Sequence, residues 1–179
     1  DGIDTDAAAA RIMAKAGLPV FVCQSFSKNL GLYQDRVGAL HVVTDNSANT
    51  AKVASQLKIS VRVNYSNPPA HGGAIVTTIL TDDKLTRQWS GEVSEMRRRI
   101  AGVRTQFVDA LAAAGVQRDF SFLNYQKGMF SFTGLTKAQA IELREKHSIY
   151  IVDSGRINVA GITSGNIDRL VSTLKSMLE

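Results

Sequence analysis

The chain has 179 residues, of which 44% are hydrophobic and 21% charged, values close to those of an average soluble globular protein. Its longest apolar runs, such as Ile149–Val152, are far too short to cross a bilayer, and its single cysteine, Cys23, excludes an intramolecular disulfide. The net charge is +5, and the densest basic cluster is Arg97–Arg99 with Arg104. Because the acids Glu92 and Glu95 accompany this cluster and no aromatic residues alternate with it, we interpret it as a solvated helix face and expect no nucleic-acid partner.

The N-terminal part alternates between helical and strand-like patterns. A helix is predicted over residues 5–16, closed by Gly17. The run Val20–Cys23 is short, apolar and bounded by turn residues, which indicates a buried strand, and a second strand is predicted over residues 37–43. Between them lies a polar segment, residues 25–36. Strands flanked by helical patterns indicate an α/β layer in which helices cover a sheet.

The middle of the chain is predicted to be largely helical. One helix is expected from Asn46 to about Asn64, before Pro68, and a shorter apolar segment covers residues 74–80. A long helix follows, with Asp83 near its start and Gly115 near its end. Its apolar residues recur every three or four positions, which predicts one stripe that packs against a core. The stripe consists of Trp89, Val93, Met96, Ile100, Val103, Phe107 and Leu111.

The last part of the chain is predicted to be a compact α+β unit. The predicted strands are residues 128–132, 149–152 and 156–159, with a helix over residues 137–146 and a final helix that begins after Thr163 or Ser164.

The most informative segment for chemistry is residues 25–38. Lys28 directly follows a strand, and strand ends are common ligand sites, whereas lysines without a function prefer solvent. A lysine held out of water can attack a carbonyl to form a Schiff base. Ser25, Ser27 and Arg36 offer two hydroxyls and a guanidinium, which are groups that hold a phosphate. By composition alone, an ordinary surface loop is favoured over a cofactor site, because many surface loops contain Ser, Lys and Gly.

This segment resembles the pyridoxal-phosphate attachment signature of the class I aminotransferases, S-x-S-K-x-x-G-L-Y-x-x-R-x-G, and every fixed position is present. The resemblance implies that Lys28 carries pyridoxal 5'-phosphate as a Schiff base and is the catalytic residue. It also implies that Ser25 and Arg36 bind the phosphate, with Ser27 as a further contact.

Two other segments resemble the aspartate aminotransferases of this family. Residues 62–72 are similar to the segment whose arginine grips the distal carboxylate of a substrate bound in the neighbouring subunit, and residues 154–161 to the segment whose arginine binds the α-carboxylate. The resemblance implies that Arg62 and Arg156 are substrate-binding residues in a homodimer with shared active sites. A guanidinium binds a carboxylate through two parallel hydrogen bonds, so two arginines suit a dicarboxylic amino acid. Phe130 is expected to shield Arg156 from water.

The resemblance also implies a fold and a reaction. Residues 1–82 would form the C-terminal part of a cofactor-binding large α/β domain with a mixed sheet, residues 83–115 a long connecting helix, and residues 116–179 a small α+β domain. The reaction moves an amino group from L-aspartate to 2-oxoglutarate, giving oxaloacetate and L-glutamate. Aminotransferases of broader or aromatic specificity stay open. So does a catalytically silent fragment, because the residues that the family places on the cofactor ring are absent from this chain.

Other candidate sites are weaker. Ser25–Lys28 also matches S-x-x-K, the nucleophile motif of penicillin-binding proteins, but the companion motifs S-D-N and K-T-G are missing. Cys23 is interpreted as a buried inert thiol. The histidines at positions 41, 71 and 147 are too scattered for a metal site. The acidic N-terminus lacks the apolar core of a secretory signal. We therefore expect a cytoplasmic protein without a membrane partner, with a mitochondrial location left open.

Overall fold

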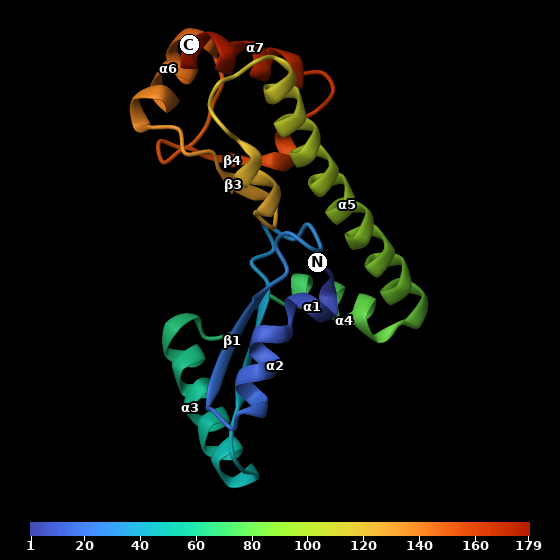
Figure 1. Cartoon of the computed structure of the whole chain (residues 1–179). Coiled ribbons are helices and arrows are strands. Elements are labelled where there is room, and N and C mark those ends of the chain that lie inside the picture. The colour runs from blue at the N-terminus through green and yellow to red at the C-terminus, as the bar shows by residue number, and fades with distance from the viewer. The chain divides into compact units, whose positions relative to one another are not determined.

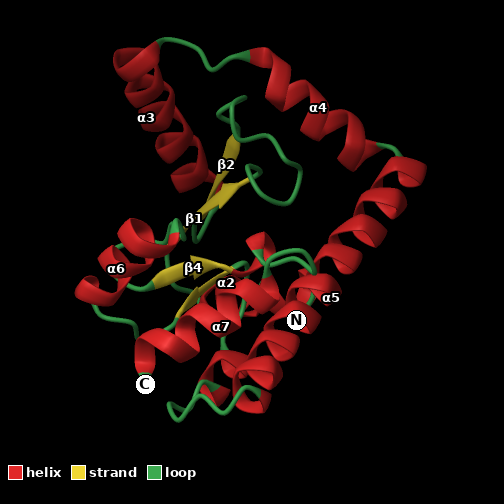
Figure 2. Cartoon of the chain, turned by 90° about the horizontal axis from the view of Figure 1, so that it is seen from above, coloured by secondary structure: helices red, strands yellow, loops and turns green.

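The computed structural model describes every residue, 1–179. The chain forms two compact units, Asp1–Val93 and Ser94–Glu179, and each combines helices with a two-stranded sheet, as Figures 1 and 2 show. This mixture of helices and strands agrees with the predicted α/β class. Helix α5 (Asp83–Ala113) contributes residues to both units. None of the helices combines the length and the apolarity needed to cross a membrane.

The first unit contains most of the elements predicted for it. In chain order they are α1 (Ile3–Asp6), α2 (Ala8–Lys15), β1 (Val20–Ser25), β2 (Gly38–Val43), α3 (Ser47–Tyr65), α4 (Ala70–Thr81) and the first residues of α5. The single helix predicted over residues 5–16 is divided at Ala7 into α1 and α2. Gly17 ends α2 with a φ of 72°, as predicted for a helix stop. The apolar segment at 74–80 lies within α4.

Strands β1 and β2 form an antiparallel pair that runs from Val20 opposite Val43 to Ser25 opposite Gly38. The two strands were predicted, but the prediction that the first is buried is wrong. Only Val20 is buried in β1, and Cys23 is exposed. An apolar strand is buried only where other layers cover both faces of its sheet. The pair lacks such cover within this unit.

The second unit places its core between three helices. Its elements are the rest of α5, the 3₁₀ helix η1 (Ser121–Tyr125), β3 (Phe130–Phe132), α6 (Lys137–His147), β4 (Arg156–Asn158), the 3₁₀ helix η2 (Val159–Gly161) and α7 (Ile167–Leu178). The core gathers Phe107 and Leu111 of α5 with Leu143 of α6 and Leu174 of α7. The predicted stripe therefore packs against a core at the C-terminal end of α5, whereas Met96 is 44% exposed.

One predicted strand of this unit is absent. Residues 149–152 form no ladder, and β3 pairs only with β4. The amide of Ile149 donates to the carbonyl of Leu143 at the end of α6 (2.9 Å), and that of Val152 donates to the carbonyl of Arg156 across a turn (3.3 Å). Because these amides close a helix end and a turn, they cannot take part in a third strand.

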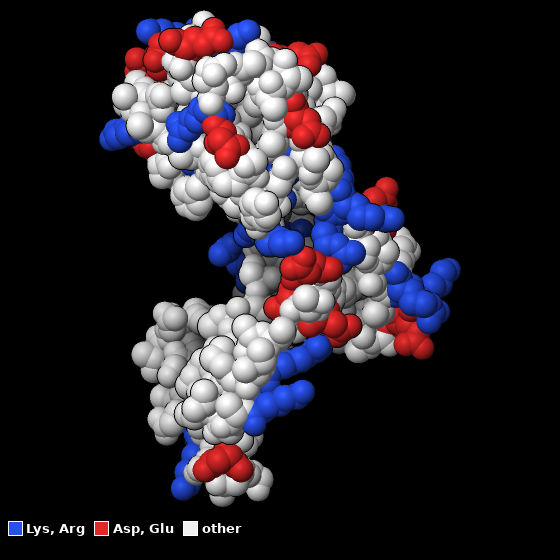
Figure 3. Space-filling model, viewed as in Figure 1, with Lys and Arg blue, Asp and Glu red and all other residues white.

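The prediction that Arg104 lies on a solvated helix face is wrong. Arg97, Arg98 and Arg99 are exposed, and Figure 3 shows basic side chains among acidic ones along α5. Arg104 is only 5% exposed. It lies four residues after Ile100 and three before Phe107, which places it on the apolar face of the helix. Helical spacing, and not the local density of arginines, decides which of them meets solvent.

Candidate functional site

The segment that joins β1 to β2 packs its apolar side chains against helix α4. The amide of Phe26 donates to the carbonyl of Val37 (3.3 Å), and that of Leu30 donates to the carbonyl of Phe26 (3.3 Å). Phe26 and Leu32 are buried together with Val76 of α4. This loop, residues 26–37, is thus anchored on α4 by its apolar residues, and its polar residues are left for binding.

Lys28 lies in the first turn of this loop, and its side chain is exposed. Its Nζ lies 5.7 Å from the centre of the Tyr33 ring, a cation–π distance, and no hydrogen bond or ion pair engages the amine. Within this chain the amine of Lys28 is therefore exposed to solvent and not held out of water.

Two hydroxyls and a guanidinium accompany the lysine. Ser25 Oγ donates to Ser27 Oγ (3.1 Å) and accepts from the amide of Ser27 (3.2 Å). Arg36 donates from Nη1 to the carbonyl of Tyr33 (3.1 Å). A guanidinium has five N–H donors, so four of those on Arg36 stay available to an anion. Arg36 has a φ of 50°, a conformation that few residues other than glycine adopt, so the turn constrains where its side chain begins.

Gly38, at the end of the signature, is required for steric reasons. A Cβ at Gly38 would lie 2.6 Å from the carbonyl oxygen of Gln24 on the paired strand. No side chain fits there without a shift of one strand. Gly38 therefore permits the pairing that places Ser25 at the end of β1, directly before the loop.

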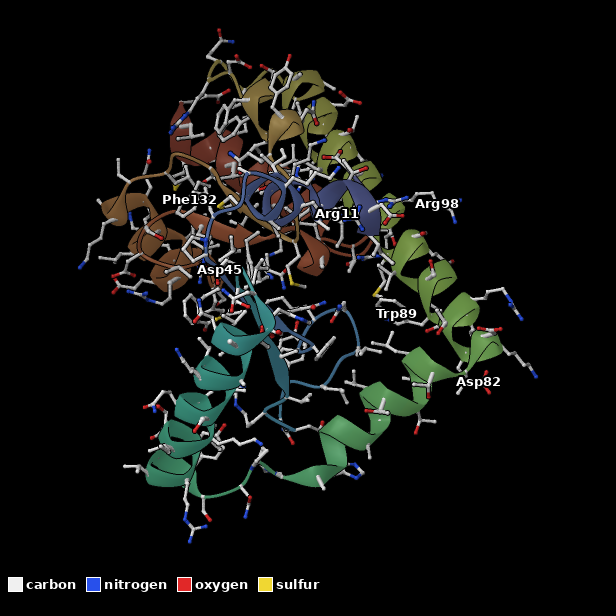
Figure 4. All side chains as sticks on the ribbon, turned by 90° about the horizontal axis from the view of Figure 1, so that it is seen from below. Arg11, Asp45, Asp82, Trp89, Arg98 and Phe132 are labelled. Carbon is white, nitrogen blue, oxygen red and sulfur yellow. The ribbon has the colours of Figure 1, made fainter.

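One contact of the loop was missed by the sequence reasoning. Trp89 of α5, labelled in Figure 4, donates from Nε1 to the carbonyl of Asn29 (2.8 Å). The side-chain Oδ1 of Asn29 is buried and has no hydrogen-bond partner. Trp89 was predicted only as one member of an apolar stripe, although a buried indole N–H usually finds an acceptor. The preference of a buried indole N–H for an acceptor was the signal that could have predicted this hydrogen bond.

Helix α4 approaches the C-terminal end of the loop through a glycine. A Cβ at Gly72 would lie 3.0 Å from the Cβ atoms of Asp35 and Val37, whereas a Cβ at Gly73 would meet nothing within 4 Å. His71 also lies 3.8 Å from Asp35, between Nε2 and Oδ1. The residues that flank Arg36 are therefore in close contact with α4.

This difference predicts opposite effects for two neighbouring substitutions. Gly73→Ala should stabilise the protein by about 0.5–1 kcal/mol, because alanine favours a helix and meets no obstacle. Gly72→Ala gains the same helical preference but crowds Asp35 and Val37, at a cost of roughly 1–3 kcal/mol. Urea unfolding of both variants measures the difference. Equal stabilisation would mean that α4 does not hold the loop as described.

Arg62 lies in the last turn of α3, is exposed, and has no hydrogen bond or ion pair. The helix ends at Ser66, which has a φ of 68° and donates its amide to the carbonyl of Val61 (3.1 Å). A charged side chain without a partner at the end of a helix is available to bind an anion. Within the first unit, the structure thus places Ser25 at the end of β1, Lys28 and Arg36 in the loop that follows, and Arg62 on a separate element.

Arg156 belongs to the second unit, on β4, where it lies opposite Phe132 of β3. Its guanidinium lies 4.9 Å from the centre of the Phe130 ring, so the expected contact is present. Phe130 is itself 40% exposed. The ring covers one face of the guanidinium, and the N–H groups at its edge stay available to a carboxylate.

Comparisons with known proteins place these residues in a wider context. The sequence model of the family described as "Aminotransferase class I and II" matches residues 2–174. An aspartate aminotransferase from Pseudomonas aeruginosa is 45% identical over 99% of the chain, and an aromatic-amino-acid aminotransferase from Escherichia coli is 42% identical over 99%. The chain spans 45% of the length of each relative.

A solved structure gives the same result for the fold. It is the aromatic-amino-acid aminotransferase from Burkholderia pseudomallei, covalently bound to pyridoxal phosphate. It superimposes with a TM-score of 0.96 at 50% identity and covers 100% of this chain and 45% of its own.

Proposed function

The chain belongs to the class I and II aminotransferases, and from that premise we propose that it forms the lysine-bearing part of an aspartate aminotransferase. The complete enzyme would move an amino group from L-aspartate to 2-oxoglutarate, giving oxaloacetate and L-glutamate. Since the chain spans 45% of its relatives' length, we propose that it is one portion of such an enzyme and is inactive alone.

The observation that carries the proposal is the end of β1 together with the loop that follows it. It presents one exposed primary amine, two linked hydroxyls and a guanidinium with donors to spare. This donor set fits pyridoxal 5'-phosphate, because an amine binds its aldehyde while hydroxyl and guanidinium donors bind its phosphate. The buried, unpartnered Oδ1 of Asn29 supports the fit, since a buried polar atom normally has a partner. The proposed roles are Lys28 for attachment, and Ser25, Ser27 and Arg36 for the phosphate.

When bound, the cofactor supplies an aldehyde for condensation with amines and a ring that withdraws electrons from the substrate's α-carbon. The chain's own residues would hold the cofactor and transfer the substrate's proton. Nζ of Lys28 would take the proton from the substrate's α-carbon as a general base and later return a proton as a general acid. Arg36 and Ser25 would keep the phosphate in place meanwhile, so that the reacting groups stay aligned.

The substrate would be held by two arginines. Arg156 would bind the α-carboxylate, with Phe130 against one face of its guanidinium. Arg62 would bind the distal carboxylate, and its lack of an intramolecular partner supports this role. We propose that Arg62 serves the site of a second subunit, so that the enzyme is a homodimer with shared active sites. The proposed location is the cytoplasm, with a mitochondrial form as the alternative.

A second function has support from the comparisons. Some relatives, including the enzyme from Escherichia coli and the solved structure from Burkholderia pseudomallei, are named aromatic-amino-acid aminotransferases. An enzyme that accepts aromatic amino acids as well as aspartate would contain the same lysine loop, so the loop cannot distinguish the two.

Steady-state kinetics of the full-length enzyme separate these functions. With 2-oxoglutarate as acceptor, we expect kcat/KM for L-aspartate to exceed that for L-phenylalanine by at least about tenfold. One charge-assisted pair at the distal carboxylate suffices for that ratio. Equal values would favour the broader specificity, and no activity with either amino acid would contradict the proposed function.

A further inference from the structure

The short sheet β3–β4 has two faces of different character. Successive residues of a strand point to opposite faces. Ser131, in the middle of β3, is 1% exposed, whereas Phe130 and Phe132 on the other face are 40% and 56% exposed. Arg156 pairs with Phe132 and extends diagonally across to Phe130. The exposed face therefore carries Arg156 with Phe130 and Phe132, and Ser131 belongs to the opposite, buried face.

The buried face is fixed to α5 by Arg104. Its Nε donates to Ser131 Oγ (3.3 Å), and its Nη2 donates to the carbonyl of Gly128 (2.5 Å), two residues before β3 begins. Burial lowers the pKa of the Arg104 guanidinium from its ordinary value. A buried cation is costly unless hydrogen bonds compensate it. Both of these bonds go to β3 or to the segment that leads into it.

We infer that Arg104 is the positioning residue for Arg156, the proposed substrate-binding arginine. Arg104 bonds to the buried face of β3, while Arg156 packs against the exposed face of the same strand. The inference rests on the proposed function of Arg156 as the α-carboxylate ligand. A strand of three residues has few ladder bonds of its own. Besides β4, it is held by Gln126, which bonds to the amide and the carbonyl of Phe132, and by Arg104, which bonds from α5 to Ser131 on the buried face. If β3 shifts, Phe130 shifts with it, and Arg156 loses the ring that sets its direction.

Affinity for butanedioate in the full-length, cofactor-loaded enzyme tests the inference. This dicarboxylate offers both carboxylates of aspartate but has no amino group to react, so its dissociation constant reports the substrate arginines alone. Arg104→Met should weaken butanedioate binding about tenfold, because a displaced guanidinium loses one charge-assisted bond. The KM for L-aspartate should rise by a similar factor while kcat changes less than twofold.

Three further variants make the result specific. Arg98→Met removes an exposed arginine of the same helix, labelled in Figure 4, and should leave the affinity unchanged. Ser131→Ala removes one of the two bonds of Arg104 without removing its charge, and should weaken binding by a smaller factor, about threefold. Arg156→Ala tests the underlying function: if it leaves butanedioate binding intact, the proposed function fails, whatever Arg104 does.

The outcomes are distinguishable. Weaker binding in Arg104→Met and Ser131→Ala, with Arg98→Met unchanged, supports the inference. Unchanged binding in a folded Arg104→Met overturns it, as does a fall in kcat alone with KM unchanged. If Arg104→Met does not fold, Ser131→Ala decides, and an affinity equal to that of the parent enzyme overturns the inference.

Discussion

Lys28→Ala in the full-length enzyme is expected to abolish transamination of L-aspartate. Lys28, whose amine is exposed, is the only lysine of residues 25–38, the segment that also contains Ser25, Ser27 and Arg36. In the proposed mechanism the same Nζ attaches the cofactor and moves the α-proton. General acid–base catalysis by a positioned group contributes about 10²- to 10⁴-fold, so kcat should fall by roughly the upper end of that range. The measurement is the rate of oxaloacetate formation at saturating substrate.

Two other exposed lysines of the first unit serve as controls for Lys28. Lys15 ends α2 and Lys52 lies on α3, and Lys15→Ala and Lys52→Ala should retain the parent rate. Borohydride reduction of the cofactor-loaded enzyme, followed by peptide mapping, should find the label on Lys28. A label on Lys15 or Lys52 would show that the attachment site has been assigned to the wrong residue.

Arg62→Leu is expected to have the second largest effect, and the effect should depend on the substrate. Losing one partner of a desolvated, charge-assisted pair costs about 2–5 kcal/mol, or roughly 30- to 4,000-fold. The value of kcat/KM for L-aspartate should fall within that range. The value for L-phenylalanine should change by less than about fivefold, because that substrate has no distal carboxylate to pair.

Lys58→Leu is the matched control for Arg62→Leu. It removes one exposed positive charge from the same helix, α3, so it corrects for any general effect of charge on anionic substrates. Its kinetics should equal those of the parent enzyme. Equal losses for aspartate and phenylalanine in Arg62→Leu would show that Arg62 supports the fold and does not read the distal carboxylate.

Local pattern by itself determined much of this protein. Apolar runs bounded by turn residues predicted the strands at Val20 and Gly38, and a regular apolar repeat predicted α5. The order of residues 25–38 predicted the family, which the comparisons confirm. These features depend on near neighbours in the chain, through backbone preference and side-chain periodicity, so a single sequence carries them.

Tertiary structure alone decided which groups are buried and which are paired. Cys23 is exposed although its strand is apolar, and Arg104 is buried although it follows a basic cluster. The predicted strand at 149–152 has its amides in a helix end and a turn. The bonds from Trp89 to Asn29 and from Arg104 to Ser131 join residues 60 and 27 positions apart. Burial and long-range hydrogen bonding depend on which layers meet in space, and that arrangement cannot be read from the local pattern of any one segment.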